Sequence, residues 1–159
     1  MLKPETLRQL LYATALVGQT EKLATFIDRG RVECRRGANL AFKYHYTLSL
    51  VVQGYTGSVD ALMIPILAWI AEQQPDLLDR APHEPFTFES ELLDADTADV
   101  SIELELSELV LVERTGKTTF VPTHVAEPVL ADAFPGVCGV CGVSLVQGLL
   151  DDGMTIVPA

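Results

Sequence analysis

The stretch LAFKYHYTLSLVV, residues 40–52, decides the fold. All of its even-numbered positions carry apolar or aromatic side chains, and most of its odd-numbered positions are polar. Successive side chains of a strand point to opposite faces, whereas the 3.6-residue period of a helix would scatter these residues around its axis. The alternation therefore predicts a long β-strand over 39–53 that buries one face and exposes the other to water.

The next segment, VDALMIPILAWIAEQ (59–73), is apolar on nearly every side. A helix of this kind is covered on both flanks, so we expect its own sheet to cover one flank and a second subunit the other. We also expect Trp69 to lie against the even-numbered face of 40–52. Pro65 leaves two readings open, because an interior proline costs about 3 kcal/mol in an exposed helix. The segment is either a kinked helix or a helix that begins near Pro65 after a looser turn.

Capping residues and hydrophobic periodicity suggest further elements on both sides of this pair. The residues after position 98 alternate as in a strand, and the apolar parity then shifts to Leu109 and Leu111, which predicts a bulge near Glu108. The other expected elements are a helix over 4–17, a second helix over 20–29 that Gly30 ends, a polar strand over 31–37, a strand over 86–93 with Phe86, Phe88 and Leu92 inward, a strand over 99–107 and a strand over 119–125.

Amphipathic strands favour an antiparallel sheet with one covered face. We therefore predict an α+β fold, a mostly antiparallel sheet with two to three helices packed on one face. Residues 1–125 form this body. Residues 126–159 are rich in proline and glycine and are read as a C-terminal arm, with a small hairpin of VSLVQ against MTIVP as one option.

The composition limits the class of function. The chain has 159 residues and a formal net charge of -11. Such an acidic chain repels phosphate, so we expect neither sequence-independent nucleic-acid binding nor binding to anionic membranes. A mean hydropathy of +0.26 points to apolar surface hidden in an assembly. No targeting segment is visible, and an odd number of cysteines favours a reducing, intracellular origin.

Residues with catalytic potential are sparse. No glycine-rich phosphate loop or nucleophile elbow is visible. Cys138 and Cys141 form a C-x-x-C pair, which can be half of a zinc site or a redox dithiol. A second pair is missing, so incidental cysteines are the favoured reading, and we predict no catalytic residue, cofactor or metal. The basic cluster Arg29, Arg31, Arg35 and Arg36 is either a solvated edge strand or a patch for an acidic neighbour.

The segment YTLSLVVQGYTGSVDALMIPILAWIAEQQPDLL (46–78) resembles the tail completion R protein family of P2-like contractile-tailed bacteriophages. The start MLKPETLRQLL and the pair FTFESELL and DVSIELELSELVLVER are similar to that family as well. The likeness covers residues 1–125 and does not include the cysteine pair. The helix signature with its internal proline and tryptophan is the specific part of the resemblance.

The resemblance implies a virion structural protein that acts in tail completion at the head-proximal end of the tail, assembled in the cytoplasm of the bacterial host. It also implies similarity to tail terminators, small α+β proteins that form a ring, expected to be a hexamer, on the tail tube. The implied partners are copies of the chain itself, the tail tube protein, and sheath and head-connector proteins. DNA would only pass through the lumen, and no membrane partner is implied. The expected subunit interface comprises Ile64, Leu67, Trp69, Arg31, Arg35 and Arg36.

Two alternatives of other classes remain open at this stage. The first is a neck adaptor that binds head or sheath proteins without terminating the tube. The second is a metal or redox domain built on Cys138 and Cys141.

Overall fold

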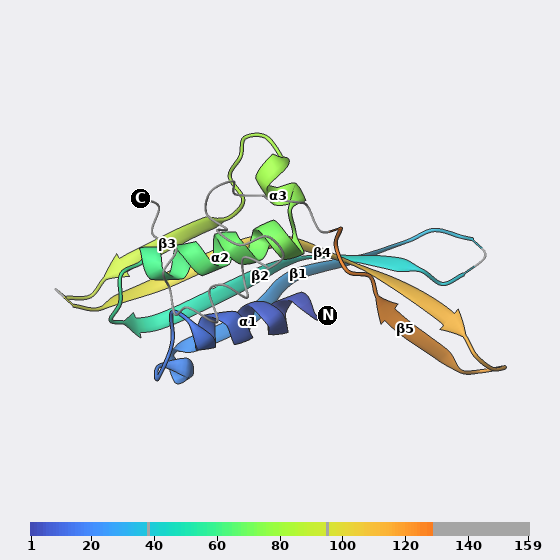
Figure 1. Ribbon diagram of the computed structural model, residues 1–159, viewed down its shortest axis with the longest axis horizontal. Helices are drawn as coiled ribbons and strands as arrows, with labels where there is room; N and C mark the ends of the chain where they lie inside the picture. Colours follow the sequence, from blue (N-terminus) through green and yellow to red (C-terminus); the bar gives the residue numbers. More distant parts are fainter. Residues whose placement is uncertain (38, 95, 129–159) are drawn as a thin grey trace, which may run out of the picture.

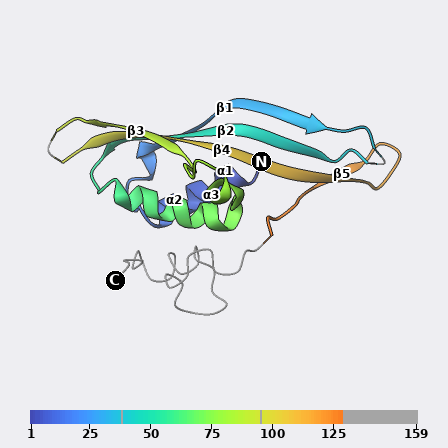
Figure 2. The same cartoon turned by 90° about the horizontal axis from the view of Figure 1, so that it is seen from above.

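The computed structural model describes residues 1–37, 39–94 and 96–128, which form a five-stranded antiparallel sheet with helices on one face (Figure 1). Figure 2 shows the helices together on one side of the sheet. The predicted α+β class is confirmed. In chain order the elements are α1 (Lys3–Ala13), the 3-10 turn η1 (Thr20–Lys22), β1 (Leu23–Cys34), β2 (Phe42–Tyr55), α2 (Asp60–Gln73), α3 (Asp76–Asp79), β3 (Thr87–Leu92), β4 (Ala98–Arg114) and β5 (Phe120–His124).

The strands are arranged in the order β1-β2-β4-β3, and β5 pairs with the far end of β4. Val110 of β4 lies opposite Phe42 of β2 and also opposite His124 of β5. Since a strand has only two edges, β5 occupies the same edge of β4 as β3. Residues 104–109 of β4 separate the two partners on that edge.

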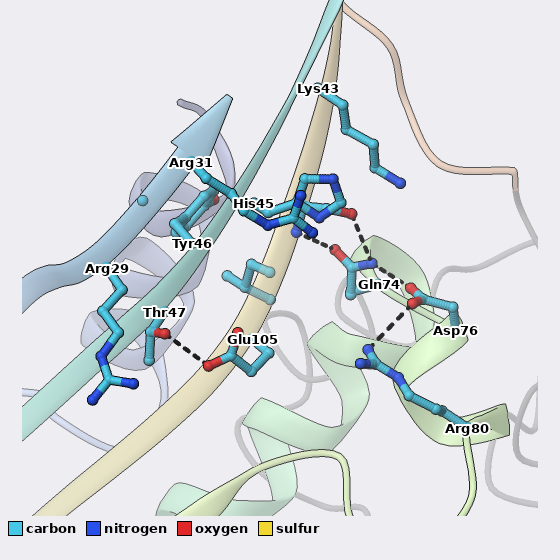
Figure 3. Close-up of a pocket in the computed structure, with 13 residues that line it drawn as sticks. Arg29, Arg31, Lys43, His45, Tyr46, Thr47, Gln74, Asp76, Arg80 and Glu105 are labelled. Atoms are coloured by element: carbon cyan, nitrogen blue, oxygen red, sulfur yellow. Dashed lines mark hydrogen bonds and ion pairs between the residues drawn. The ribbon is translucent and has the colours of Figure 1, made fainter. Parts of the chain in front are cut away.

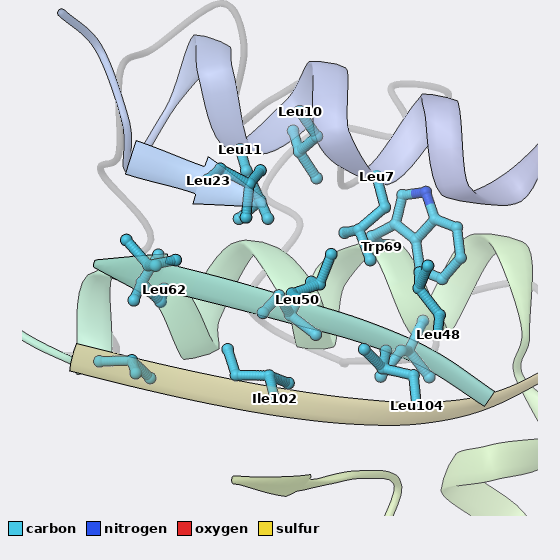
Figure 4. Packing of buried hydrophobic residues seen from close by; sticks show 14 of the residues in the cluster. Leu7, Leu10, Leu11, Leu23, Leu48, Leu50, Leu62, Trp69, Ile102 and Leu104 are labelled. Atoms are coloured by element: carbon cyan, nitrogen blue, oxygen red, sulfur yellow. The ribbon is translucent and has the colours of Figure 1, made fainter. Parts of the chain in front are cut away.

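The strand predicted from 40–52 is β2, and its even-numbered side chains face the helices. Leu48, Leu50 and Val52 are fully buried, and the adjacent even-numbered side chains of β4 extend the same layer. Leu7, Leu11 and other residues of the two long helices close the core from the opposite side (Figure 4). Full burial of one such side chain stabilises the fold by about 1.5–3 kcal/mol.

α2 is one helix that runs through Pro65. The proline ring lacks the N–H that would bond to the carbonyl of Ala61. Leu62, Ile66 and Ile70 of the same helix are fully buried against the sheet. Burial of these side chains offsets the lost hydrogen bond. The reading in which the helix begins near Pro65 is therefore wrong.

The predicted second helix over 20–29 is wrong. Only Thr20–Lys22 is helical, and the chain then enters β1, which pairs with β2 over its whole length. Gly30 lies inside this strand, opposite Tyr46, and does not end a helix. An edge strand has one exposed side and weak alternation, so its periodicity resembles that of a short helix.

The predicted bulge near Glu108 is also wrong. The pairing of β2 with β4 runs without a shift from Phe42–Val110 to Val52–Val100. Leu109 and Leu111 therefore lie on the open face of the sheet, where both are exposed, and Glu108 points to the helix side, where it is buried. The two real irregularities lie elsewhere, between Ile27 and Arg29 and between Val52 and Tyr55.

β3 confirms the strand predicted over 86–93, but its apolar side chains are not inward. Phe88 is 54% exposed and Leu92 is 80% exposed, because β3 is an edge strand that the helices do not cover. Phe86 is partly buried against the core. The predicted C-terminal hairpin lies outside the described residues.

Candidate assembly surface

The part of the sheet that reaches beyond the helices is the first candidate surface. This sheet extension comprises residues 29–34 of β1, 42–47 of β2, 107–114 of β4, and β5. Figures 1 and 2 show it projecting past α1 and α2. Val32 is 60% exposed, and the exposed apolar residues include members of both faces: Val32 and Phe120 on the helix side, and Leu109, Leu111 and Val121 on the open side. Leu109, Leu111 and Val121 are neighbours on the open side, and grouped exposed apolar side chains of this kind favour a surface that a partner covers.

Glu108 anchors the N-terminus of α1 to the base of this extension. Its carboxylate accepts hydrogen bonds from the backbone N–H groups of Leu2, at 2.7 Å, and Lys3, at 3.3 Å, and from the hydroxyl of Tyr46. A negative charge at this position also complements the positive end of the helix dipole. Burial raises the pKa of Glu108, but these hydrogen bonds outweigh burial and hold its pKa below the usual value.

Two further groups respond to the same carboxylate. Burial, and then the hydrogen bond to Glu108, raise the pKa of Tyr46 far above its ordinary value, so the phenol stays a donor. The Nδ1 atom of His124 lies 2.9 Å from Oε2 of Glu108. This nitrogen has no hydrogen-bond partner among the described residues, so its contact with Glu108 is an ion pair only when the ring is charged. Glu108 thus joins α1, β2, β4 and β5 at one point.

Lys3 and Gln74 close the gap in the β4 edge between β3 and β5. The Nζ atom of Lys3 donates to the carbonyl of Ser107 at 2.9 Å, and Oε1 of Gln74 accepts from the Ser107 N–H at 3.1 Å. Lys3 also donates to Gln74 at 2.8 Å and pairs with Glu127 at 2.7 Å. Side chains here satisfy backbone groups that would otherwise be orphaned. The edge is therefore capped by side chains at Ser107, in contrast to the outer edges of β1 and β3.

A groove of about 530 Å³ lies on the open face of the sheet beside α3 (Figure 3). Thr47 donates to Glu105 at 2.7 Å within it, and Arg80 lies 3.5 Å from Asp76. Over the described part of the chain, Arg29, Arg31 and Lys43 form neither an ion pair nor a hydrogen bond through their side chains. Arg31 attracts Glu33 electrostatically. In an acidic protein, three cations gathered on one surface favour contact with an acidic partner.

The structure places the predicted arginines on or next to this surface. Arg31 lines the groove from β1. Arg35 and Arg36 follow the end of β1 and are exposed, and Arg35 lies 3.8 Å from Glu33, which also pairs with His45. An exposed pair of this kind contributes little to stability. The three arginines therefore lie along one edge of the sheet.

The other predicted interface residues lie on α2 and have different environments. Ile64 and Leu67 are partly buried and do not belong to the core cluster. Trp69 is 1% exposed, and its indole N–H donates to Thr6 of α1 at 3.1 Å. Trp69 packs on β2 as expected, but it presents no surface to a second subunit.

The described residues contain no group of three or more His, Cys, Asp or Glu side chains placed to hold a metal ion. Cys34 is a free, exposed thiol. Cys138 and Cys141 lie outside the described residues. Within the parts of the chain that are described, no helix is long and apolar enough to cross a membrane.

Comparison with known proteins gives two matches to the same family. Residues 1–128 match the family model of the P2 phage tail completion protein R. The chain is 36% identical over 132 residues to the tail completion protein R of Escherichia phage P2, a match that covers 80% of this chain and 84% of the relative. No solved structure matches.

Proposed function

Because the chain belongs to the P2 phage tail completion protein R family, whose members are structural proteins of the phage tail and not enzymes, we propose that it forms a ring that terminates the tail. In this proposal the ring caps the tail tube at its head-proximal end and joins it to the head connector. The partners are other copies of the chain, the tail tube protein, and sheath and head-connector proteins. The number of subunits expected is six.

The observation that carries the proposal is the sheet extension. Its apolar side chains lie on both faces, so a single partner docked on one face would leave the other in water. A ring subunit meets one neighbour on each side and stacks on further proteins above or below, which covers both faces. The net charge of -11 is compatible with DNA passing through the lumen, since like charge prevents it from binding there.

Ile64 and Leu67 are proposed as a subunit contact on the outer side of α2. Replacing Ile64 by aspartate is expected to abolish ring formation, because a desolvated carboxylate without a partner opposes association. The partly buried position leaves the core residues of α2 in place. Light scattering of the purified variant measures the loss, and circular dichroism with thermal denaturation controls for folding. A folded variant with the mass of the wild-type assembly would remove Ile64 from the interface.

The terminating role is tested on tails made without the protein. We expect negative-stain electron microscopy to show tubes that exceed the normal length, because nothing stops the addition of tube subunits. Tubes of normal length that fail to join heads would instead indicate a neck adaptor, and the terminator proposal would be withdrawn. Complementation with the wild-type chain provides the matched control.

A further inference from the structure

Building on the proposed ring, we propose which surfaces join its subunits: the outer edge of β3 in one copy pairs with the outer edge of β1 in the next, and the sheet continues from subunit to subunit. Both are terminal strands of the sheet, and in the described parts of the chain no other strand pairs with their outer sides. Unpaired strand edges are templates for pairing with another chain. The proposal identifies the partner of the basic β1 edge as a second copy of this chain.

Strand direction favours this junction. All neighbours in the order β1-β2-β4-β3 are antiparallel, so β1 and β3 run in opposite directions. A rotation about an axis along the strands preserves direction, and it therefore brings β3 antiparallel to β1 of the neighbour. The junction repeats the antiparallel pairing found within the subunit, and the interface is head-to-tail, as a closed ring requires.

Side-chain parity and charge together favour one register. Such a rotation also preserves faces, so the open face of β3 meets the open face of β1. If Arg31 lies opposite Glu89, then Arg29 lies opposite Glu91, and both pairs are on the open face. Val32 then lies opposite Phe88 on the helix side, where both side chains are exposed in the single subunit. Opposite charges and apolar pairs directly across a ladder both stabilise it.

The shift between neighbouring subunits along the strands agrees with a sheet that closes into a ring. Within one subunit the pairings place Glu89 of β3 at the level of Val51 of β2, and Ala24 of β1 lies at that same level. Arg31 of β1 lies at the level of His45 of β2. The neighbour is thus displaced by six β2 residues, from Val51 to His45, or roughly 20 Å, across four strands that span roughly 19 Å. The resulting tilt of about 46° is close to the 35–45° of closed sheets.

Charge disfavours a two-fold pairing of β1 centred on Gly30 and a two-fold pairing of β3 centred on Ser90. In these registers Arg29 of one copy lies opposite Arg31 of the other, and Glu89 lies opposite Glu91. The cysteine test below covers the β1 pairing centred on Val32. Across the described residues, neither Arg29, Arg31, Glu89 nor Glu91 forms an ion pair through its side chain, although Arg31 is close enough to Glu33 to attract it electrostatically. Like charges directly opposite destabilise a ladder.

The first test reverses the charge of each edge separately. One variant carries Arg29→Glu and Arg31→Glu, and the other carries Glu89→Arg and Glu91→Arg. Each alone is expected to stay monomeric by size-exclusion chromatography with light scattering, while an equimolar mixture regains the wild-type mass with alternating subunits. Glu103→Arg reverses one charge on the inner strand β4 and should keep the wild-type mass. Circular dichroism verifies folding of every variant.

The second test probes the register with cysteine pairs, in a chain with Cys34→Ser, Cys138→Ser and Cys141→Ser. Val32→Cys combined with Phe88→Cys is expected to give a ladder of linked subunits on oxidation. Val32→Cys combined with Leu92→Cys, displaced by four residues, should not. A dimer from Val32→Cys alone would show two-fold pairing of β1 and overturn the proposal.

The outcomes separate this inference from the proposed function. A wild-type ring whose edge variants fail to recover on mixing, or never lose assembly, overturns the β1–β3 junction and leaves the ring intact. A wild-type chain that stays monomeric, alone and on tail tubes, overturns the ring and the junction together.

Discussion

Replacing Glu108 by alanine is expected to destabilise the fold by about 3 kcal/mol. The change orphans the backbone N–H groups of Leu2 and Lys3 and the hydroxyl of Tyr46, all of which donate to this carboxylate. It also releases α1 from β4, because few other polar contacts join them. Urea denaturation followed by circular dichroism measures the effect. Glu113→Ala, on the exposed end of the same strand, is the matched control and should change stability by no more than about 0.5 kcal/mol.

The pH dependence of this contribution has a defined sign. The folded-state pKa of Glu108 is lowered, so its charged form stabilises the fold at pH values above the unfolded pKa of about 4.3. That stability is lost as the pH falls through the lowered folded value. The difference in unfolding free energy between the wild type and Glu108→Gln should therefore be full at pH 7 and shrink below about pH 4. A difference that stays constant from pH 7 to pH 3 would show that Glu108 does not act through its charge.

Replacing Leu50 by alanine is expected to cost about 3–4 kcal/mol. Leu50 is fully buried at the centre of β2, between the sheet and both long helices (Figure 4). The substitution removes three buried carbon atoms and leaves a cavity that the rigid sheet cannot close. The midpoint of urea denaturation should fall with an unchanged slope, which indicates a change in stability and not in the unfolded state.

Val51→Ala is the control for Leu50→Ala, because Val51 is its neighbour on the other face of the same strand. Val51 is only partly buried, so we expect a loss of about 1 kcal/mol or less. Equal losses at the two positions would contradict the two-faced character of β2, on which the whole architecture depends.

Recognition of the long strand and the apolar helix required only local sequence. Both have strong periodic patterns, and each pattern is produced by one dominant effect, the burial of one face. The residues of β1 up to Arg29 resemble a helix in sequence because the edge position weakens the alternation, whereas the strand predicted from residue 31 agrees with the end of β1. Phe88 and Leu92 were assigned to the interior because their parity is that of the helix side, but only the positions of the helices decide whether that side is covered.

Glu108 is the converse case, a charged residue that is buried although local sequence does not predict it. Its position in β4 is an inward one, and a charged residue there interrupts the apolar pattern, which local sequence presents as a bulge. Its partners, Leu2, Lys3 and Tyr46, are 106, 105 and 62 residues away in the chain. The break in the apolar alternation at Glu108 is the one local sign of this contact. Its interpretation requires the N-terminus of α1, which no local pattern places beside β4.

The sequence by itself determined the α+β class, the two-faced strand β2 and the helix α2, because side-chain burial along one element is a local property that leaves a periodic record. The family followed from the resemblance of whole segments to known members. Only the tertiary structure decided which edges of the sheet remain unpaired, which apolar residues stay in water and which charge anchors α1. These features depend on contacts between residues far apart in the chain, and such contacts leave no period in the sequence.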